Sequence, residues 1–360
     1  MNRQSESKKS GKKKVVFYCK YASTSGLYHA KRSLAAADML SEWDILFLID
    51  EASNEMKQFI EGKGYRTRSV YGSSSLLAAI KEEMPDLLVR DGDQTDLDES
   101  KAVKELVPAV IHFDDFGTGG QEADLVLHTL YQENREPFPP HYVSGPDSYV
   151  IPEEFVAYKH RGKMKEVNPI PHLVIYHGYE DPENLTYRTL RHILQLQIPL
   201  KVTILLGEGY KHSKDDIRMM ALGRRNTTVV SPPYSLPEEL VKADIVVCSA
   251  GYTPYDVAVI GLPCIVIAQN EQELQNAFPK EENGFIHLGL GRKVKQSLLL
   301  NAIMEMLLHD ARRERAVKRQ LSLNLFGGKE KIAETILYYL DYPPRSENNV
   351  SLQKTKNMLK

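Results

Sequence analysis

The stretch 245–278 constrains the fold of this chain more than any other. It contains two short apolar runs rich in β-branched residues, Ile245–Ser249 and Pro263–Ala268, which are long enough for buried strands and too short for helices. Between them, a glycine turn leads into the segment Pro254–Ile260, whose leading proline suits the first turn of a helix and which Gly261 can cap. The pattern predicts a strand, a turn, a helix and a second, parallel strand.

The turn between these runs has the properties of an anion site. A glycine turn that opens a helix presents free backbone N–H groups and the positive end of the helix dipole, which suits phosphate. Asp256 lies one turn into the helix, where a carboxylate is placed to accept hydrogen bonds from ribose hydroxyls. Because such turns are common in parallel α/β proteins, the prediction also depends on the amide-rich start of the next helix. We therefore expect a nucleotide site formed by Gly251, Thr253, Asp256, Asn270, Gln272 and Asn276.

Strand-like runs and helix-like segments alternate along most of the chain, which predicts parallel sheets built from βαβ units. A proline-rich, charged stretch between two such series marks a domain boundary. We expect an α/β fold with two domains facing each other across a cleft. The predicted division is a disordered basic arm (1–14), an N-terminal Rossmann-like domain (15–150), a linker (151–171), a C-terminal nucleotide-binding Rossmann-like domain (172–326), a helix crossing back (327–341) and a disordered tail (342–360).

Composition excludes several classes of partner. The formal net charge of −2 over 360 residues predicts binding to neither nucleic acid nor a membrane surface. No apolar stretch is adequate for a signal peptide or a membrane span, so we expect a cytoplasmic protein. The three cysteines are isolated within or beside apolar runs, which indicates reduced core residues. Neither a metal motif nor a Walker-type phosphate loop is present, and no cofactor is predicted.

Three polar constellations lie where predicted strands end. Gly26 precedes His29 at a helix start, where the dipole favours a neutral imidazole that can act as a base at the mouth of the cleft; a structural role is the alternative. Asp114 and Asp115 follow a strand and suit either metal binding or a turn; together with Gly26 and Arg32 they are also predicted to contact the substrate. Gly178 follows another strand and is a second candidate for phosphate or sugar contact.

Taken in order, these residues resemble one family, that of the spore-coat polysaccharide protein SpsG and the pseudaminic-acid pathway hydrolase PseG, which are relatives of the MurG-type GT-B glycosyltransferases. The resemblance runs from about Val15 to Leu340. Its motifs are Gly26-x-x-His29-x-x-Arg32, Asp114-Asp115-x-Gly117, Gly145-Pro146 with Glu154-Phe155, Asp181-Pro182-x-Asn184-Leu185-Thr186, Leu206-Gly207-x-Gly209-Tyr210, Ala250-Gly251-x-Thr253 with Asp256, Gly261-Leu262-Pro263 and Gly327-Gly328-Lys329-x-Lys331-Ile332.

This resemblance implies a GT-B-like pair of Rossmann-like domains with a nucleotide-sugar in the cleft and UDP on the C-terminal domain. In the hydrolase, water attacks the anomeric carbon and UDP leaves without a metal. The family's base falls on His29, its flanking residues on Gly26 and Arg32, and its ribose carboxylate on Asp256. The chain departs from the family's glycines at three places. Tyr28 replaces the glycine before His29, the usual double glycine is His177-Gly178-Tyr179, and the usual Gly-Gly-x-Thr turn is Ala250-Gly251-Tyr252-Thr253; the ribose carboxylate is Asp256 where the family more often has Glu.

The resulting prediction is an enzyme of surface or spore-coat polysaccharide synthesis that hydrolyses or transfers the sugar of a UDP-linked amino or deoxy sugar. Water and a sugar hydroxyl are equivalent nucleophiles to a base, so both reactions stay open. The alternatives are a non-catalytic nucleotide-sugar binder or scaffold, and a nucleotide-sugar epimerase. The predicted partners are the nucleotide-sugar and other enzymes of polysaccharide synthesis.

Overall fold

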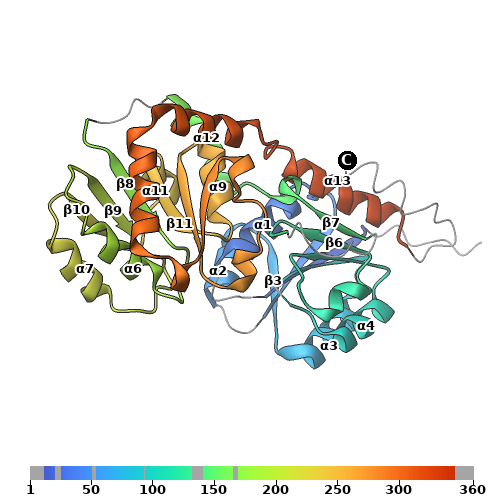
Figure 1. Ribbon diagram of the computed structural model, residues 1–360. Helices are drawn as coiled ribbons and strands as arrows, with labels where there is room; N and C mark the ends of the chain where they lie inside the picture. The colour runs from blue at the N-terminus through green and yellow to red at the C-terminus, as the bar shows by residue number, and fades with distance from the viewer. Residues whose placement is uncertain are drawn as a thin grey trace, which may run out of the picture.

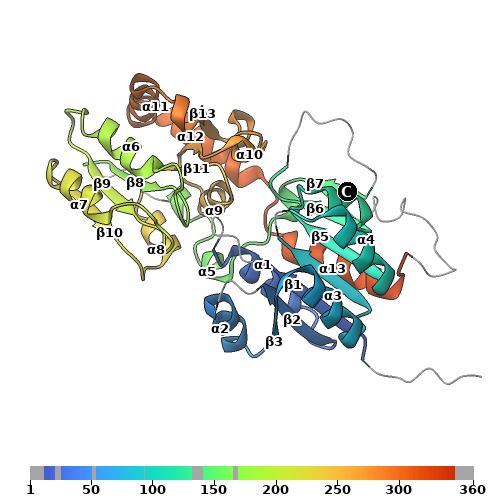
Figure 2. The same ribbon diagram turned by 90° about the horizontal axis from the view of Figure 1, so that it is seen from below.

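Two parallel β-sheets organise the chain, as the alternation predicts (Figure 1). The computed structural model describes residues 12–20, 26–50, 54–92, 94–131, 141–164 and 169–344. Residues 1–11 of the expected basic arm and 345–360 of the expected tail lie outside the described residues. The two sheets and their helices form two separate layered bodies in both views (Figures 1 and 2).

The first sheet has seven strands in the order β3-β2-β1-β4-β5-β6-β7. Helices α1, α2 and α13 pack on one face, and α3 and α4 cover the other. The elements of this part are β1 Lys14–Cys19, α1 Tyr28–Asp38, β2 Asp44–Asp50, α2 Asn54–Gly62, β3 Arg66–Val70, α3 Gly72–Glu83, β4 Leu87–Asp91, α4 Leu97–Leu106, β5 Ala109–Phe113, β6 Leu125–His128 and β7 Tyr142–Ser144.

The second sheet has six strands in the order β10-β9-β8-β11-β12-β13. One face packs on α6, α7 and α11, and the other on α5, α8 and α9. Its elements, with the short helix before it, are α5 Glu153–Val156, β8 His172–Tyr176, α6 Leu185–Ile193, β9 Lys201–Leu205, α7 Lys214–Leu222, β10 Thr227–Val230, α8 Leu236–Leu240, β11 Ile245–Ser249, α9 Thr253–Ile260, β12 Cys264–Ala268, α10 Glu271–Leu274, β13 Phe285–Leu290, α11 Gln296–Leu308 and α12 Asp310–Ser322.

Each sheet reverses its strand order once, between β1 and β4 and between β8 and β11. In open parallel sheets, ligands bind at the carboxyl ends of the strands that flank such a reversal. The ends of β1, β4, β8 and β11 and the segments that follow them are therefore the expected site, and they include His29, Asp91, Gly178 and Gly251. The predicted GT-B-like fold class is confirmed.

Sequence periodicity located almost every element within a few residues, and the largest error has a physical cause. The apolar run 125–131 predicts a strand, but β6 ends at His128. The Asp114 carboxylate accepts the N–H groups of Thr129 (2.6 Å) and Leu130 (3.0 Å), which draws the chain out of the sheet. Asp114 itself adopts a left-handed backbone conformation (φ 45°), so β5 also ends earlier than expected.

Helix α13, Gly328–Asp341, leaves the second body and packs on the first (Figure 1). Its apolar face, including Ile332, Ile336 and Leu340, is part of the same core as β1 and α1. Lys331 forms an ion pair with Asp147 at 2.8 Å. The first sheet therefore obtains one of its covering helices from the end of the chain.

Replacing Ile336 with alanine should lower the free energy of unfolding by about 2–5 kcal/mol, because a fully buried side chain leaves a cavity. Urea unfolding followed by circular dichroism measures this. Glu334→Ala, at an exposed position of the same helix, should change stability by less than about 0.5 kcal/mol. Equal effects of the two variants would show that α13 is not part of the core.

Candidate functional site

The stretch 245–278, with its turn Ala250–Thr253 (the focal turn), folds as predicted. Thr253–Ile260 forms α9 between β11 and β12, with Pro254 in its first turn and Gly261 capping it in a left-handed conformation (φ 82°). All eight residues of α9 are buried, so the helix is held rigidly behind the glycine turn. The carboxyl ends of β11 and β12 thus lie side by side with the positive end of a helix dipole between them.

A cavity of about 630 Å³ opens beside this turn and is lined by residues of both bodies. Its volume lies within the usual range for small-molecule sites. Leu27, Tyr28 and Lys31 line it from the first body, and the segments after β8, β9, β11 and β12 line it from the second. The predicted site residues that line it are Gly178, Gly251, Thr253, Asp256, Asn270 and Gln272.

Asp256 lies at the base of this cavity, and the hydroxyl of Tyr149 donates to its Oδ1 at 2.5 Å. Burial, with a smaller contribution from the charge of Glu154, raises the pKa of Asp256 to about 7, although the Tyr149 hydrogen bond opposes the rise. The carboxyl is therefore divided between its neutral and ionised forms near neutral pH. A cavity-lining acid with such a pKa is typical of a functional site.

Asn276 was predicted to contact the ligand, and the structure gives it another role. Its Nδ2 donates to the carbonyl of Ala250 at 2.8 Å, and its side chain is buried outside the cavity lining. It therefore fixes the turn from behind.

Glu273 is a cavity residue that the sequence did not single out. Its Oε2 accepts the N–H groups of Ala250 (3.1 Å) and Gln269 (2.8 Å), the first residues after β11 and β12. Burial raises the pKa of Glu273 to about 7, against the effect of these two hydrogen bonds. A glutamate one turn into the helix after a strand was the available signal, but on its own it indicates a solvated helix face.

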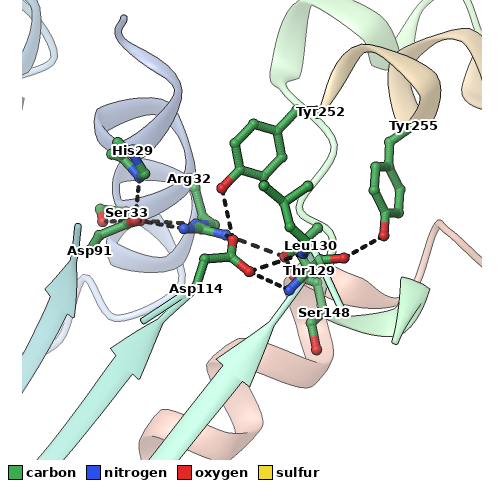
Figure 3. A network of polar contacts seen from close by, with 10 residues as sticks. All are labelled: His29, Arg32, Ser33, Asp91, Asp114, Thr129, Leu130, Ser148, Tyr252 and Tyr255. Carbon is green, nitrogen blue, oxygen red and sulfur yellow. Dashed lines mark hydrogen bonds and ion pairs between the residues drawn. The ribbon is translucent and has the colours of Figure 1, made fainter. Parts of the chain in front are cut away.

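Arg32 is the centre of a buried ion network rather than a ligand contact (Figure 3). Its Nε and Nη2 donate to both oxygens of Asp91 at 2.9 and 2.6 Å, and its Nη1 donates to Asp114 at 2.5 Å. The guanidinium also lies 4.6 Å from the ring centre of Phe113. Burial alone would raise the pKa of Asp91. The charges of Arg32 and His29 outweigh this effect and lower that pKa to about 2.

His29 does not lie at the mouth of the cleft, so that prediction is wrong. Its side chain is fully buried and its Nδ1 is 2.6 Å from Asp91 Oδ1 (Figure 3). Its sequence neighbour Tyr28 lines the cavity, whereas His29 does not. Its position at the start of α1 was predicted correctly, but Asp91 holds the imidazole within the first body.

The paired aspartates likewise face inward, away from the cavity. Asp115 accepts the N–H groups of Thr95 (3.0 Å) and Gly117 (2.9 Å) and contacts His112 Nδ1 at 2.6 Å, so it fixes the loop after β5. Of the two predicted roles of this pair, metal binding and a turn, the structure has the turn. No group of three or more metal-ligating side chains forms a metal site within the described ranges.

Tyrosines join the two bodies beside the cavity. Tyr252 of the focal turn stacks on Tyr28, with ring centres 3.7 Å apart, and its hydroxyl donates to Asp114 at 2.8 Å. Gly26 was predicted to bind substrate, but it does not line the cavity. Its φ is 55°, and an added Cβ would lie 2.5 Å from the ring of Tyr179, so this position needs glycine for close packing between the bodies.

Comparisons with known proteins support this class of fold. No family model matches the chain. An uncharacterized protein of Methanocaldococcus jannaschii, MJ1062, is 24% identical over 262 residues, which are 68% of this chain. The chain spans about half (54%) of that relative's length. The spore coat polysaccharide biosynthesis protein SpsG of Bacillus subtilis is 23% identical over 239 residues, 62% of this chain and 68% of SpsG.

Solved structures match over nearly the whole chain. MurG of Acinetobacter baumannii has a TM-score of 0.67 at 15% identity, covering 90% of this chain and 99% of its own. The UDP-GlcNAc 2-epimerase of Neisseria meningitidis, bound to UDP-GlcNAc, has a TM-score of 0.59 at 12% identity. The match covers 90% of this chain and 99% of the epimerase. The chain therefore has the two-domain GT-B fold and is a distant relative of SpsG. None of its described helices is long and apolar enough to cross a membrane.

Replacing Arg32 with alanine should lower the free energy of unfolding by about 3–5 kcal/mol, because it leaves two buried carboxylates without their cation. Lys31→Ala is the matched control. Lys31 is partly exposed and pairs with Glu154 at 2.8 Å, so its loss should cost less than about 1 kcal/mol. Urea denaturation at pH 7 compares them, and a small effect of Arg32→Ala would remove its central role.

Proposed function

We propose that the cavity binds a nucleotide-activated sugar, with the nucleotide held by the second body. The observation that supports this most strongly is the convergence of Gly251, Thr253 and Asp256 with Asn270 and Gln272 around one cavity. Backbone N–H groups at the start of α9 suit a diphosphate, and Asp256 suits ribose hydroxyls. The UDP-GlcNAc bound to the structurally similar epimerase supports the same ligand class.

The reaction proposed is displacement at the anomeric carbon, in which a sugar hydroxyl or water forms the new C–O bond and the nucleotide diphosphate leaves. The similarity to SpsG supports a place in surface polysaccharide synthesis. Transfer or hydrolysis would need a base on the cavity wall. Asp256, Glu273 and His177 line the cavity, whereas His29 is buried and does not. A base exposed to the substrate is a geometric requirement of both reactions.

The burial of His29 favours a second candidate, a protein that binds the nucleotide-sugar without converting it. The purified protein incubated with UDP-, CMP- and GDP-sugars distinguishes the two. Release of nucleotide without an acceptor supports hydrolysis, and release only with a glycan acceptor supports transfer. Binding without release supports the second candidate, and an epimerised sugar in the product would replace both.

Replacing Tyr28 with glycine should increase nucleotide release without an acceptor, because it removes the wall between the cavity and His29. In the double variant Tyr28→Gly/His29→Ala, the rate of nucleotide release should be lower than in Tyr28→Gly by a factor of roughly 10²–10⁴, the range for loss of a positioned base. A coupled assay for free UDP measures both variants. An increase that persists without His29 would show that the imidazole is structural only.

Replacing Asp256 with asparagine should weaken UDP binding at least tenfold at pH 8, where the carboxyl is mostly ionised. A charge-assisted hydrogen bond to ribose is worth roughly 1.5–3 kcal/mol. Tyr149→Phe keeps the carboxylate and should change affinity by less than about threefold, since it removes a neutral hydrogen bond. Unchanged affinity for Asp256→Asn in calorimetry would place the nucleotide elsewhere.

A further inference from the structure

The backbone of the focal turn already binds a carboxyl group of this chain, that of Glu273. Two backbone N–H groups, from Ala250 and Gln269, point to one oxygen of Glu273 from the ends of adjacent strands. Backbone N–H groups beside a helix N-terminus make an anion site. Glu273 therefore occupies part of the place where the phosphates of a nucleotide would be expected.

The second oxygen of Glu273 has a different environment. It lies against Gly251, where an added Cβ would be only 3.3 Å from Oε1. Gly251 and Glu273 both line the cavity, and both N–H bonds go to Oε2. One oxygen is thus engaged by the turn, and the other is the one available to carry a proton toward a ligand.

The charges around Glu273 oppose a further negative group. Asp181 on the segment before α6 raises its pKa, and Asp256 on α9 lines the same cavity. On α10 itself, Glu271 pairs with Arg292 at 3.3 Å outside the cavity lining. Lys31 is the one lysine or arginine among the described lining residues, and it is paired with Glu154. An incoming phosphate thus meets more carboxyl groups than cations.

We propose that Glu273 takes up a proton when a phosphate group of the ligand enters the cavity, so that binding of phosphate-bearing ligands is coupled to pH. The ionised carboxylate repels the phosphate. The protonated form removes that repulsion and donates its O–H to a phosphate oxygen, while Oε2 continues to accept the two N–H groups. Because the proton is taken from solvent, affinity falls as pH rises. This inference rests on the proposed nucleotide site and adds a ligand-linked proton to it.

The test compares UDP binding by wild-type protein and Glu273→Gln in isothermal titration calorimetry at pH 7, in two buffers of different ionisation enthalpy. Glutamine keeps the oxygen that accepts the N–H groups and carries a permanent donor. The protons taken up by UDP and by Asp256 are common to both proteins and cancel in the difference. Wild type should take up roughly half a proton more, because Glu273 is about half protonated before binding.

Affinity should show the same coupling. Between pH 6 and pH 8, the rise in Kd for UDP should be roughly tenfold larger for wild type than for Glu273→Gln. Glu271→Gln, an exposed change on the same helix, should behave as wild type. If UDP binds and both proteins take up equal numbers of protons, the role of Glu273 is refuted while the nucleotide site stands. If wild type binds neither UDP nor inorganic pyrophosphate at pH 6, both proposals fail.

Discussion

The buried guanidinium of Arg32 is the interaction on which the arrangement of the site depends. It joins Asp91 at the end of β4 to Asp114 just after β5, and thereby fixes two neighbouring strand ends. A buried charge tolerates little change of geometry, because each lost partner leaves an uncompensated ion. Asp114 then binds Thr129 and Leu130 within the first body and Tyr252 of the second. One ion network thus sets both the loops of the first body and the position of the focal turn.

One residue at which this chain departs from the family resemblance, Tyr28, lies at a contact between the two bodies. Tyr28 stands in place of a glycine and stacks on Tyr252, while Tyr179 packs against Gly26. Aromatic rings therefore line the cavity, whereas the imidazole that the resemblance assigns to catalysis is buried and does not line it. The cavity persists, and the side chains able to exchange protons that line it include Asp256, Glu273 and His177, but not His29.

Most of the fold was predictable from the sequence because apolar strands and capped helices leave local signals. The turn at Gly251 and the helix to Ile260 were located from a proline, a glycine and two apolar runs. The roles of His29 and Arg32 were not predictable, because each depends on a partner brought close by the tertiary fold. The turn at Asp115 was one of two predicted alternatives, since its partner Gly117 lies two residues along the chain. His29 is held by Asp91, 62 residues along the chain. Glu273 was missed because only the adjacency of two strand ends gives its carboxyl a function.

The return of α13 to the first sheet has a consequence for how the protein is made. Ile332, Ile336 and Leu340 complete the core that also contains Val15 and Phe17. Domains generally fold as units while the chain is being synthesised, beginning with the N-terminal one. Here the ribosome must translate the whole second body before the first can close its core. During translation, the part of the first sheet's apolar face that α13 covers therefore stays exposed until the second body has been synthesised.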